Sequence, residues 1–171
     1  MSYQSAAVDV SVGLAAGWIA TKITDLAQGP LSRATPEREK AREPETPEGG
    51  SAMSAARKIT ERAGVNAGTG ELQTLKSGIH YGLGAGWGLV YVLLRRHTRL
   101  GPMAAGAITG VALAVVIDEI CNPALDITPP CDAYPLSSHI RGLAAHLVYG
   151  ISLAAAGELM HRLVRRRGHW G

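Results

Sequence analysis

Four long stretches of this chain carry almost no charged residues, and clusters of charge mark their ends. The stretches cover about residues 6–27, 75–95, 102–120 and 140–164. A helix that spans a membrane needs roughly 20 mainly apolar residues, because the bilayer core offers the backbone no water to bond with. Each stretch meets this need, provided that Asp9, Lys22 and Asp25 of the first are placed at the interfaces. The sequence therefore predicts four transmembrane helices.

Small residues dominate these stretches, which distinguishes them from the helices of a soluble core. The chain has 21 glycines and no phenylalanine. A helix rich in Gly and Ala buries little apolar area in water, whereas in lipid it lets helix backbones approach closely. Glycines spaced four residues apart occur at Gly13 and Gly17, at Gly106 and Gly110, and at Gly78, Gly82 and Gly86. We expect an all-α, integral membrane four-helix bundle with GxxxG packing, in which the last three glycines form a stripe against a neighbouring helix.

A polar segment, residues 27–74, separates the first two predicted spans. It contains two short stretches with helical character, 35–42 and 51–64, of which the second has an apolar face formed by Met53, Ala56 and Ile59. Such a helix can rest on the membrane surface or serve as a solvated connector. We therefore expect a single membrane domain, 1–171, with this loop and its short surface helices inserted between helices one and two.

Arginines cluster at the ends of the second and fourth stretches, and these clusters predict the orientation. They are Arg95, Arg96, Arg99, Arg162, Arg165, Arg166 and Arg167. Short basic flanks lie on the cytoplasmic side of a membrane, so four spans place both termini inside, and the corner 120–139 faces the periplasm. Residues 27–74 also carry basic residues, but long loops obey this rule less well. Without interleaved aromatic residues, the basic clusters do not indicate nucleic-acid binding.

The two halves of the chain share a short pattern. The spacing D-x4-P occurs from Asp25 to Pro30 and again from Asp118 to Pro123. A histidine then lies near the start of each following span, His80 in the second and His146 in the fourth. We interpret this as two parallel helix-loop-helix repeats related by an axis along the membrane normal. Chance agreement of so short a pattern is the alternative.

Six ionisable residues are predicted to lie in one layer near the periplasmic ends of the helices. They are Lys22, Asp25, His80, Asp118, Glu119 and His146. At ~1.5 Å per residue, each histidine lies about one to two turns inside its helix. Ionisable residues at membrane depth usually face the interior of a bundle. We therefore expect these side chains to approach one another as a polar cluster.

Two cysteines, Cys121 and Cys131, lie ten residues apart in the proline-rich corner between the third and fourth spans. In the oxidising periplasm this pair is a candidate disulfide. The alternative is that they are two unrelated small residues.

Four blocks of this sequence form a recognisable pattern: W-I-A-T-K-I-T-D from Trp18, H-Y-G-L-G-A-G from His80, D-E-I-C-N-P-A-L-D-I-T-P-P from Asp118 and H-L-V-Y-G from His146. Together these blocks resemble the YagU-like family of bacterial inner-membrane proteins. The resemblance covers about residues 10–160, and D-E-x-x-N-P-x-L-x-x-T-P-P is its most specific part. It implies a multi-pass bacterial inner-membrane protein with four helices. It implies no substrate, cofactor or catalytic residue, and the cysteine pair is not a feature of the family pattern.

The polar cluster admits more than one role. A non-enzymatic structural clasp and a site that responds to protons or ions are both compatible with histidines beside carboxylates. A bis-histidine haem b or metal site formed by His80 and His146 is the second hypothesis, because two histidines at equal depth on facing helices suit an axial pair. The third is an accessory subunit that docks on a larger membrane complex or forms a homo-oligomer.

Enzyme chemistry is not indicated by any motif of this sequence. It contains no phosphate-binding loop, no HExxH and no nucleophile beside a base. Asp118 and Glu119 are adjacent, so on an α-helix they point ~100° apart and do not form an acid-base couple. We therefore expect a non-enzymatic protein whose principal partner is the lipid bilayer.

Overall fold

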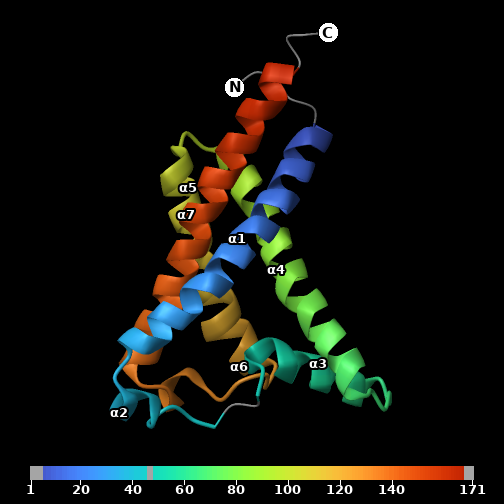
Figure 1. Cartoon of the computed structure of the whole chain (residues 1–171), viewed down its shortest axis with the longest axis vertical. Coiled ribbons are helices and arrows are strands. Elements are labelled where there is room, and N and C mark those ends of the chain that lie inside the picture. Colours follow the sequence, from blue (N-terminus) through green and yellow to red (C-terminus); the bar gives the residue numbers. More distant parts are fainter. Residues whose placement is uncertain (1–5, 46–47, 168–171) are drawn as a thin grey trace.

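A computed structural model of the chain describes residues 6–45 and 48–167, and every regular element in these ranges is helical (Figure 1). The α-helices are α1 (Ala6–Ala34), α2 (Glu37–Lys40), α3 (Gly50–Arg62), α4 (Thr69–His97), α5 (Pro102–Leu113), α6 (Asn122–Ala124) and α7 (Leu136–Arg167). A π-helix, η1 (Ala114–Cys121), continues α5, and a single 3-10 turn, η2 (Cys131–Ala133), precedes α7. The predicted domain 1–171 includes residues 1–5, 46–47 and 168–171, which lie outside the described ranges.

Three helices in the described part of the chain are long and apolar enough to cross a membrane. They are Ala6–Ala34, Pro102–Ala124 and Leu136–Arg166. The chain is thus compatible with a membrane protein, although four spans were expected. The predicted span that is missing from these three is the second, 75–95, which lies in α4; this helix is long enough but contains many glycines together with His80 and Tyr81, which lower its mean hydropathy. The first predicted span, 6–27, lies in a helix that is apolar enough to cross a membrane, despite Asp9, Lys22 and Asp25.

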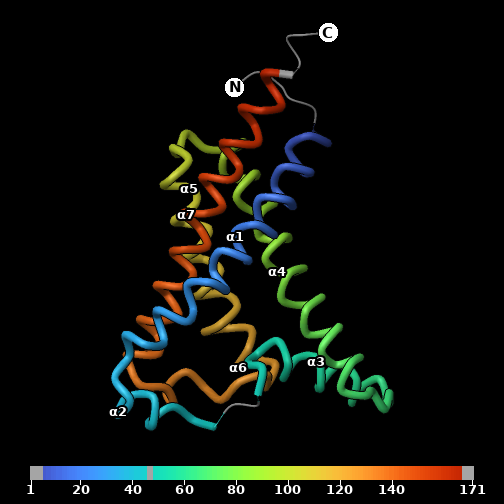
Figure 2. The backbone as a smooth tube through the Cα atoms, in the orientation of Figure 1, coloured from blue at the N-terminus to red at the C-terminus, as the bar shows by residue number. Residues whose placement is uncertain are grey.

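The long helices form one elongated body with α1 at its centre. Helix α1 packs along α4 and α7, α5 packs along α7, and α4 meets α5 beside their short connection. Figure 2 shows α1 and α4 crossing and then diverging toward the end that carries α2, α3 and α6. Helix α1 begins and α7 ends at the opposite end. The residues between these helices must therefore be small where they cross.

The crossing of α1 and α4 depends on two glycines from each helix. A Cβ atom on Gly88 would overlap the carbonyl of Gly13, and one on Gly17 would overlap the carbonyl of Gly84. Backbone meets backbone here, so no side-chain rotation makes room. The same arrangement recurs between α5 and α7, where Gly106 lies against Gly150.

The predicted glycine stripe on α4 is on the wrong face. A Cβ on Gly78, Gly82 or Gly86 would meet no atom within 4 Å. The packed glycines, Gly84 and Gly88, are offset by two positions, and two positions turn a helix by roughly 200°. Periodicity therefore identified a glycine stripe, but the helix presents the nearly opposite face to α1.

The buried core is narrow, and large apolar side chains lie mainly on the outside. Tyr91, Thr109, Tyr149 and Leu153 are buried, and the Tyr149 hydroxyl donates to the Gly84 carbonyl at 2.6 Å. Exposed large apolar residues include Trp18, Leu26, Leu93, Met103, Ile108, Ile151 and Leu159. In water such an extensive apolar surface is unusual for a monomer, whereas lipid covers it without cost.

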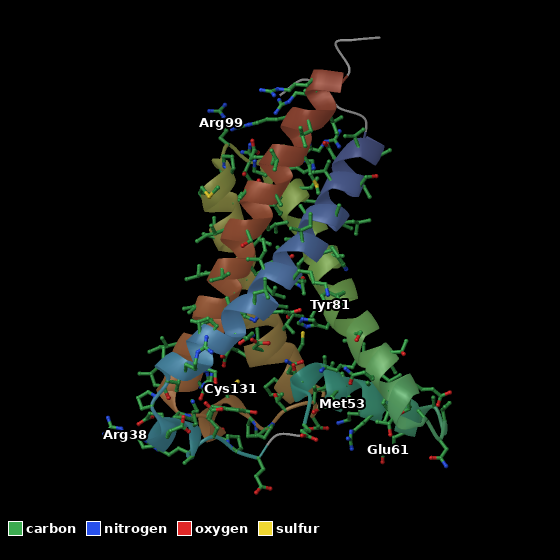
Figure 3. All side chains as sticks on the ribbon, viewed as in Figure 1. Arg38, Met53, Glu61, Tyr81, Arg99 and Cys131 are labelled. Carbon is green, nitrogen blue, oxygen red and sulfur yellow. The ribbon has the colours of Figure 1, made fainter. Side chains whose placement is uncertain are left out.

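A polar cap closes the end where α1 and α4 diverge. Helix α3 packs on α4 and buries Met53 and Ala56, while Ile59, expected on the same face, is exposed. Lys58 on α3 reaches the Asp126 carboxylate at 3.3 Å, which ties α3 to the corner after α6. The two helices expected at 35–42 and 51–64 thus form as a shorter α2 and as α3. In Figure 3, Arg38, Met53, Glu61 and Cys131 lie at this capped end, and Arg99 lies at the other.

Candidate functional site

Three histidine–carboxylate pairs lie toward the capped end of the bundle. His80 Nε2 is 2.8 Å from Asp25 Oδ1, His146 Nε2 is 2.7 Å from Asp118 Oδ2, and His139 Nδ1 is 2.7 Å from Glu119 Oε1. Each pair joins two elements, α4 to α1 in the first case and α7 to η1 in the other two. We call these three pairs the polar layer.

The first pair is part of a small network between α1 and α4. Asp25 also accepts a hydrogen bond from the Tyr81 hydroxyl at 2.7 Å. The Lys22 ammonium donates to the Tyr81 oxygen at 2.9 Å and lies 4.3 Å from the centre of that ring. Trp18 completes the group, with its ring centre 5.5 Å from the Lys22 ammonium. Lys22, Asp25 and His80 therefore come together as expected.

The π-helix η1 directs two adjacent carboxylates toward α7. Asp118 reaches His146 and Glu119 reaches His139, and these histidines are seven residues apart on α7, so they share one face. Gly142 lies between them, and a Cβ there would be 3.9 Å from Asp118. π-helical turns are rare and are found disproportionately at functional sites. The unusual backbone coincides with the densest part of the polar layer.

The six predicted site residues do not form one shared cluster. Lys22, Asp25 and His80 belong to the α1–α4 network, and Asp118 with His146 belongs to the η1–α7 contact. Glu119 pairs with His139, which the sequence analysis did not include. Among the described residues no hydrogen bond or ion pair links His80 to His146, so the expected convergence is wrong at the level of direct contacts.

His139 lies between two hydrogen-bond acceptors. Its Nδ1 faces the Glu119 carboxylate at 2.7 Å, and its Nε2 faces the Cys131 carbonyl at 3.1 Å. A carboxylate and a carbonyl only accept hydrogen bonds, and a neutral imidazole has only one N–H. Both contacts are satisfied together only when the ring carries two protons. The geometry therefore describes His139 as an imidazolium that forms an ion pair with Glu119.

His146 is in the opposite situation. Its Nε2 bonds to Asp118, while its buried Nδ1 has no hydrogen-bond partner among the described residues. A proton on Nδ1 would be a buried donor of a charged ring without a partner, which is costly. The favoured form is thus a neutral ring that donates from Nε2, and the negative charge of Asp118 is left without a compensating cation at this contact.

The predicted disulfide does not form, and Cys121 and Cys131 are free thiols. Cys121 ends the π-helix, whereas the Cys131 Sγ donates to the Glu119 carbonyl at 3.1 Å. Contact with Glu119 and partial burial raise the pKa of the Cys131 thiol above its usual value. A raised pKa leaves less thiolate at neutral pH and makes the sulfur a weaker nucleophile.

The predicted haem or metal site is not favoured by this geometry. The Nε2 atoms of His80 and His146 both face carboxylates, so neither is free to act as an axial ligand without breaking its pair. Within residues 6–45 and 48–167, no group of three or more His, Cys, Asp or Glu side chains is arranged to hold a metal ion.

Three important residues of the site were missed from the sequence: Tyr81, His139 and Arg141. Tyr81 adjoins His80, and its hydroxyl binds Asp25. His139 lies in the corner 120–139 at the start of α7, outside the stretch expected to be buried. Arg141 pairs at 2.7 Å with Glu43, which lies almost a hundred positions earlier in the chain. The one sequence feature that could have indicated His139 and Arg141 is that they follow Asp118 and Glu119 across a single corner of the chain.

Comparisons with protein-family models, with curated proteins and with solved structures find no match to this chain.

Proposed function

We propose that this chain is a non-enzymatic, multi-pass protein of a bacterial inner membrane, of the YagU-like kind, in which α4 also spans the membrane as the second helix of a four-helix bundle. Helix α4 lies against α1 through Gly84 and Gly88, the kind of close small-residue contact that helices make in lipid. It spans 29 residues, about 44 Å at ~1.5 Å per residue, which exceeds the ~30 Å of a bilayer core. Contacts with α1 and α5 offset the modest hydropathy of α4.

The packing contacts support the proposed repeats. Gly13 and Gly17 precede Asp25 by the same spacings with which Gly106 and Gly110 precede Asp118. All four glycines lie at helix crossings, Gly13 and Gly17 with α4 and Gly106 and Gly110 with α7. The histidines are not equivalent, however. His80 lies one turn before its crossing at Gly84, whereas the backbone of His146 is itself at the crossing with Gly110.

The function that this arrangement supports best is a proton-responsive clasp. Each pair of the polar layer joins two elements toward the capped end, where α1 and α4 diverge. Histidine is the side chain whose charge changes between about pH 5 and 8, so its pairing with a carboxylate depends on the proton concentration. The observation that carries the proposal is His139, whose two ring nitrogens both face acceptors at once.

The sign of the proton response follows from this geometry. Protonated His139 donates to both Glu119 and Cys131, and loss of one proton removes a donor and the positive charge together. The clasp is therefore strongest at mildly acidic pH and weakens as the pH rises through the titration of the histidine. The neighbouring charged groups, Glu43 and Arg141, are paired with each other at 2.7 Å.

We expect the thermal stability of the purified protein in nanodiscs to fall by several degrees between pH 6 and pH 8.5. A His139→Asn variant is expected to be less stable at pH 6 and to lose most of this dependence. The matched control is His97→Asn, which changes an exposed histidine at the end of α4 that lies away from the cap. This variant should keep the wild-type pH profile of stability. Equal pH profiles for wild type and His139→Asn would show that the contact of His139 is structural and does not respond to protons.

Thiol labelling tests the proposed orientation, with both termini inside. We expect Cys131 to react with a membrane-impermeant maleimide in intact cells, because η2 lies at the capped end outside the candidate spans. Its raised pKa predicts that labelling is slower at pH 7 than after unfolding and accelerates as the pH increases. The single variants Cys121→Ala and Cys131→Ala assign the signal. Labelling that appears only after lysis would place the cap in the cytoplasm.

A further inference from the structure

A cavity of about 440 Å³ opens beside the η1–α7 part of the polar layer. The π-helix and the first two turns of α7 line the cavity, together with Glu43 and the first two residues of α3, Gly50 and Ser51. The volume is in the range of sites for small organic ligands and far exceeds the space that one ion needs. Neither the clasp nor the helix packing explains a cavity at this position.

Among the described residues, charge pairing leaves one uncompensated group in the wall of this cavity. Its charged lining residues are Glu43, Asp118, Glu119, His139 and Arg141. Glu43 is paired with Arg141 at 2.7 Å, and Glu119 is paired with the imidazolium of His139 at 2.7 Å. Asp118 contacts only the neutral ring of His146 and, at 3.5 Å, the amide of Asn122. The cavity therefore carries one net negative charge, at Asp118.

Asp118 is also accessible to a ligand. Its side chain is 39% exposed, and one imidazole N–H uses only part of the acceptor capacity of a carboxylate. Ala114 and Val115 on η1 and Leu143 on α7 contribute apolar side chains to the same lining. A carboxylate next to an apolar wall complements a molecule that has a cationic head and a small apolar body.

We propose that this cavity binds a protonated primary amine that carries a small apolar group, with its ammonium at Asp118. A primary ammonium supplies the positive charge that is missing beside Asp118. It also supplies N–H donors for the free acceptor sites of the Asp118 carboxylate. An anion is disfavoured, because Arg141, the one guanidinium among the described lining residues, is already paired with Glu43. This inference goes beyond the proton-responsive clasp, and it is tested by ligand binding rather than by stability.

The first test compares three aromatic probes of nearly equal shape on the wild-type protein in nanodiscs. Benzylamine is cationic at pH 7, benzyl alcohol is neutral and benzoate is anionic. We expect benzylamine to bind at least tenfold more tightly than the other two, by calorimetry corrected with empty nanodiscs. We also expect benzylamine to slow alkylation of Cys131, which lines the same cavity. Equal binding of the three probes, or no protection of Cys131, would overturn the proposal.

The second test removes the charge. Asp118→Asn is expected to weaken benzylamine binding at least tenfold, whereas Asp132→Asn, an exposed carboxylate in the same corner that does not line the cavity, should leave binding unchanged. If Asp118→Asn does not fold, the probe comparison on the wild-type protein still decides the question. Benzylamine binding that survives Asp118→Asn in a folded variant would refute the assigned position. A stability that does not change with pH would rule out the proton-responsive clasp but would not affect the conclusion from benzylamine binding.

Discussion

Replacing Gly88 with leucine is expected to destabilise the bundle by about 3 kcal/mol, the upper end of the usual cost of overpacking a well-packed interior. A Cβ at this position would overlap the carbonyl of Gly13 and would also approach Gly17. The obstacle is backbone on both sides, so relief requires α1 and α4 to separate along their crossing. Unfolding of the reconstituted protein by a denaturant titration, with loss of helical circular dichroism, measures the effect.

Gly82→Leu is the matched control for this experiment. It makes the same change on the same helix, at a position where a Cβ meets no atom within 4 Å. We expect its stability to stay within about 0.5 kcal/mol of wild type, the usual range for surface substitutions. Gly150→Leu is expected to repeat the Gly88 result in the other half, because Gly150 lies against Gly106. Equal damage by Gly82→Leu and Gly88→Leu would mean that the crossing is placed on the wrong face of α4.

The long helices were predictable because their physical cause is local. Length and the scarcity of charge indicate where a helix can cross a membrane. Helices α1, α4 and α7 cover their predicted stretches, and α5 covers its stretch together with the π-helix η1 that continues it. Their ends extend beyond the predictions, since α4 begins at Thr69 and α1 continues past Pro30. Polar residues outside the lipid can continue a helix without any change in apolar pattern. Hydropathy therefore located the helices but not their ends.

The contacts between helices were less predictable, because they depend on rotation about each helix axis. The glycine pattern of α4 offers two stripes, and the sequence does not distinguish the packed Gly84 and Gly88 from the open Gly78 and Gly82. The π-helix changes the direction of Asp118 and Glu119 relative to an α-helix, so both face α7. The prediction placed these residues at the correct end of the molecule but assigned Glu119 no partner of its own.

Removal of His146 is the second large effect that we expect. His146→Ala leaves Asp118 in a partly buried position with only a 3.5 Å contact to the Asn122 amide. An unsatisfied polar group of this kind costs about 1–3 kcal/mol. His80→Ala is the built-in comparison. His80 is the more exposed histidine, with 43% of its side chain accessible against 21% for His146, and Asp25 keeps its bond from Tyr81. We therefore expect His80→Ala to cost clearly less.

A double-mutant cycle isolates the contact itself. The loss caused by His146→Ala contains the cavity left by the ring as well as the missing hydrogen bond, and Asp118→Asn changes only the carboxylate. If the pair is energetically coupled, the double variant is less destabilised than the sum of the single variants, by about 0.5–3 kcal/mol. The measurement is the free energy of unfolding of the four proteins at pH 7 in the same lipid. Strict additivity, or a larger loss for His80→Ala than for His146→Ala, would show that the η1–α7 pair does not hold these elements together. Coupling would instead show that Asp118 holds η1 to α7 through His146, which uses only part of the acceptor capacity of the carboxylate and leaves the rest for the proposed amine.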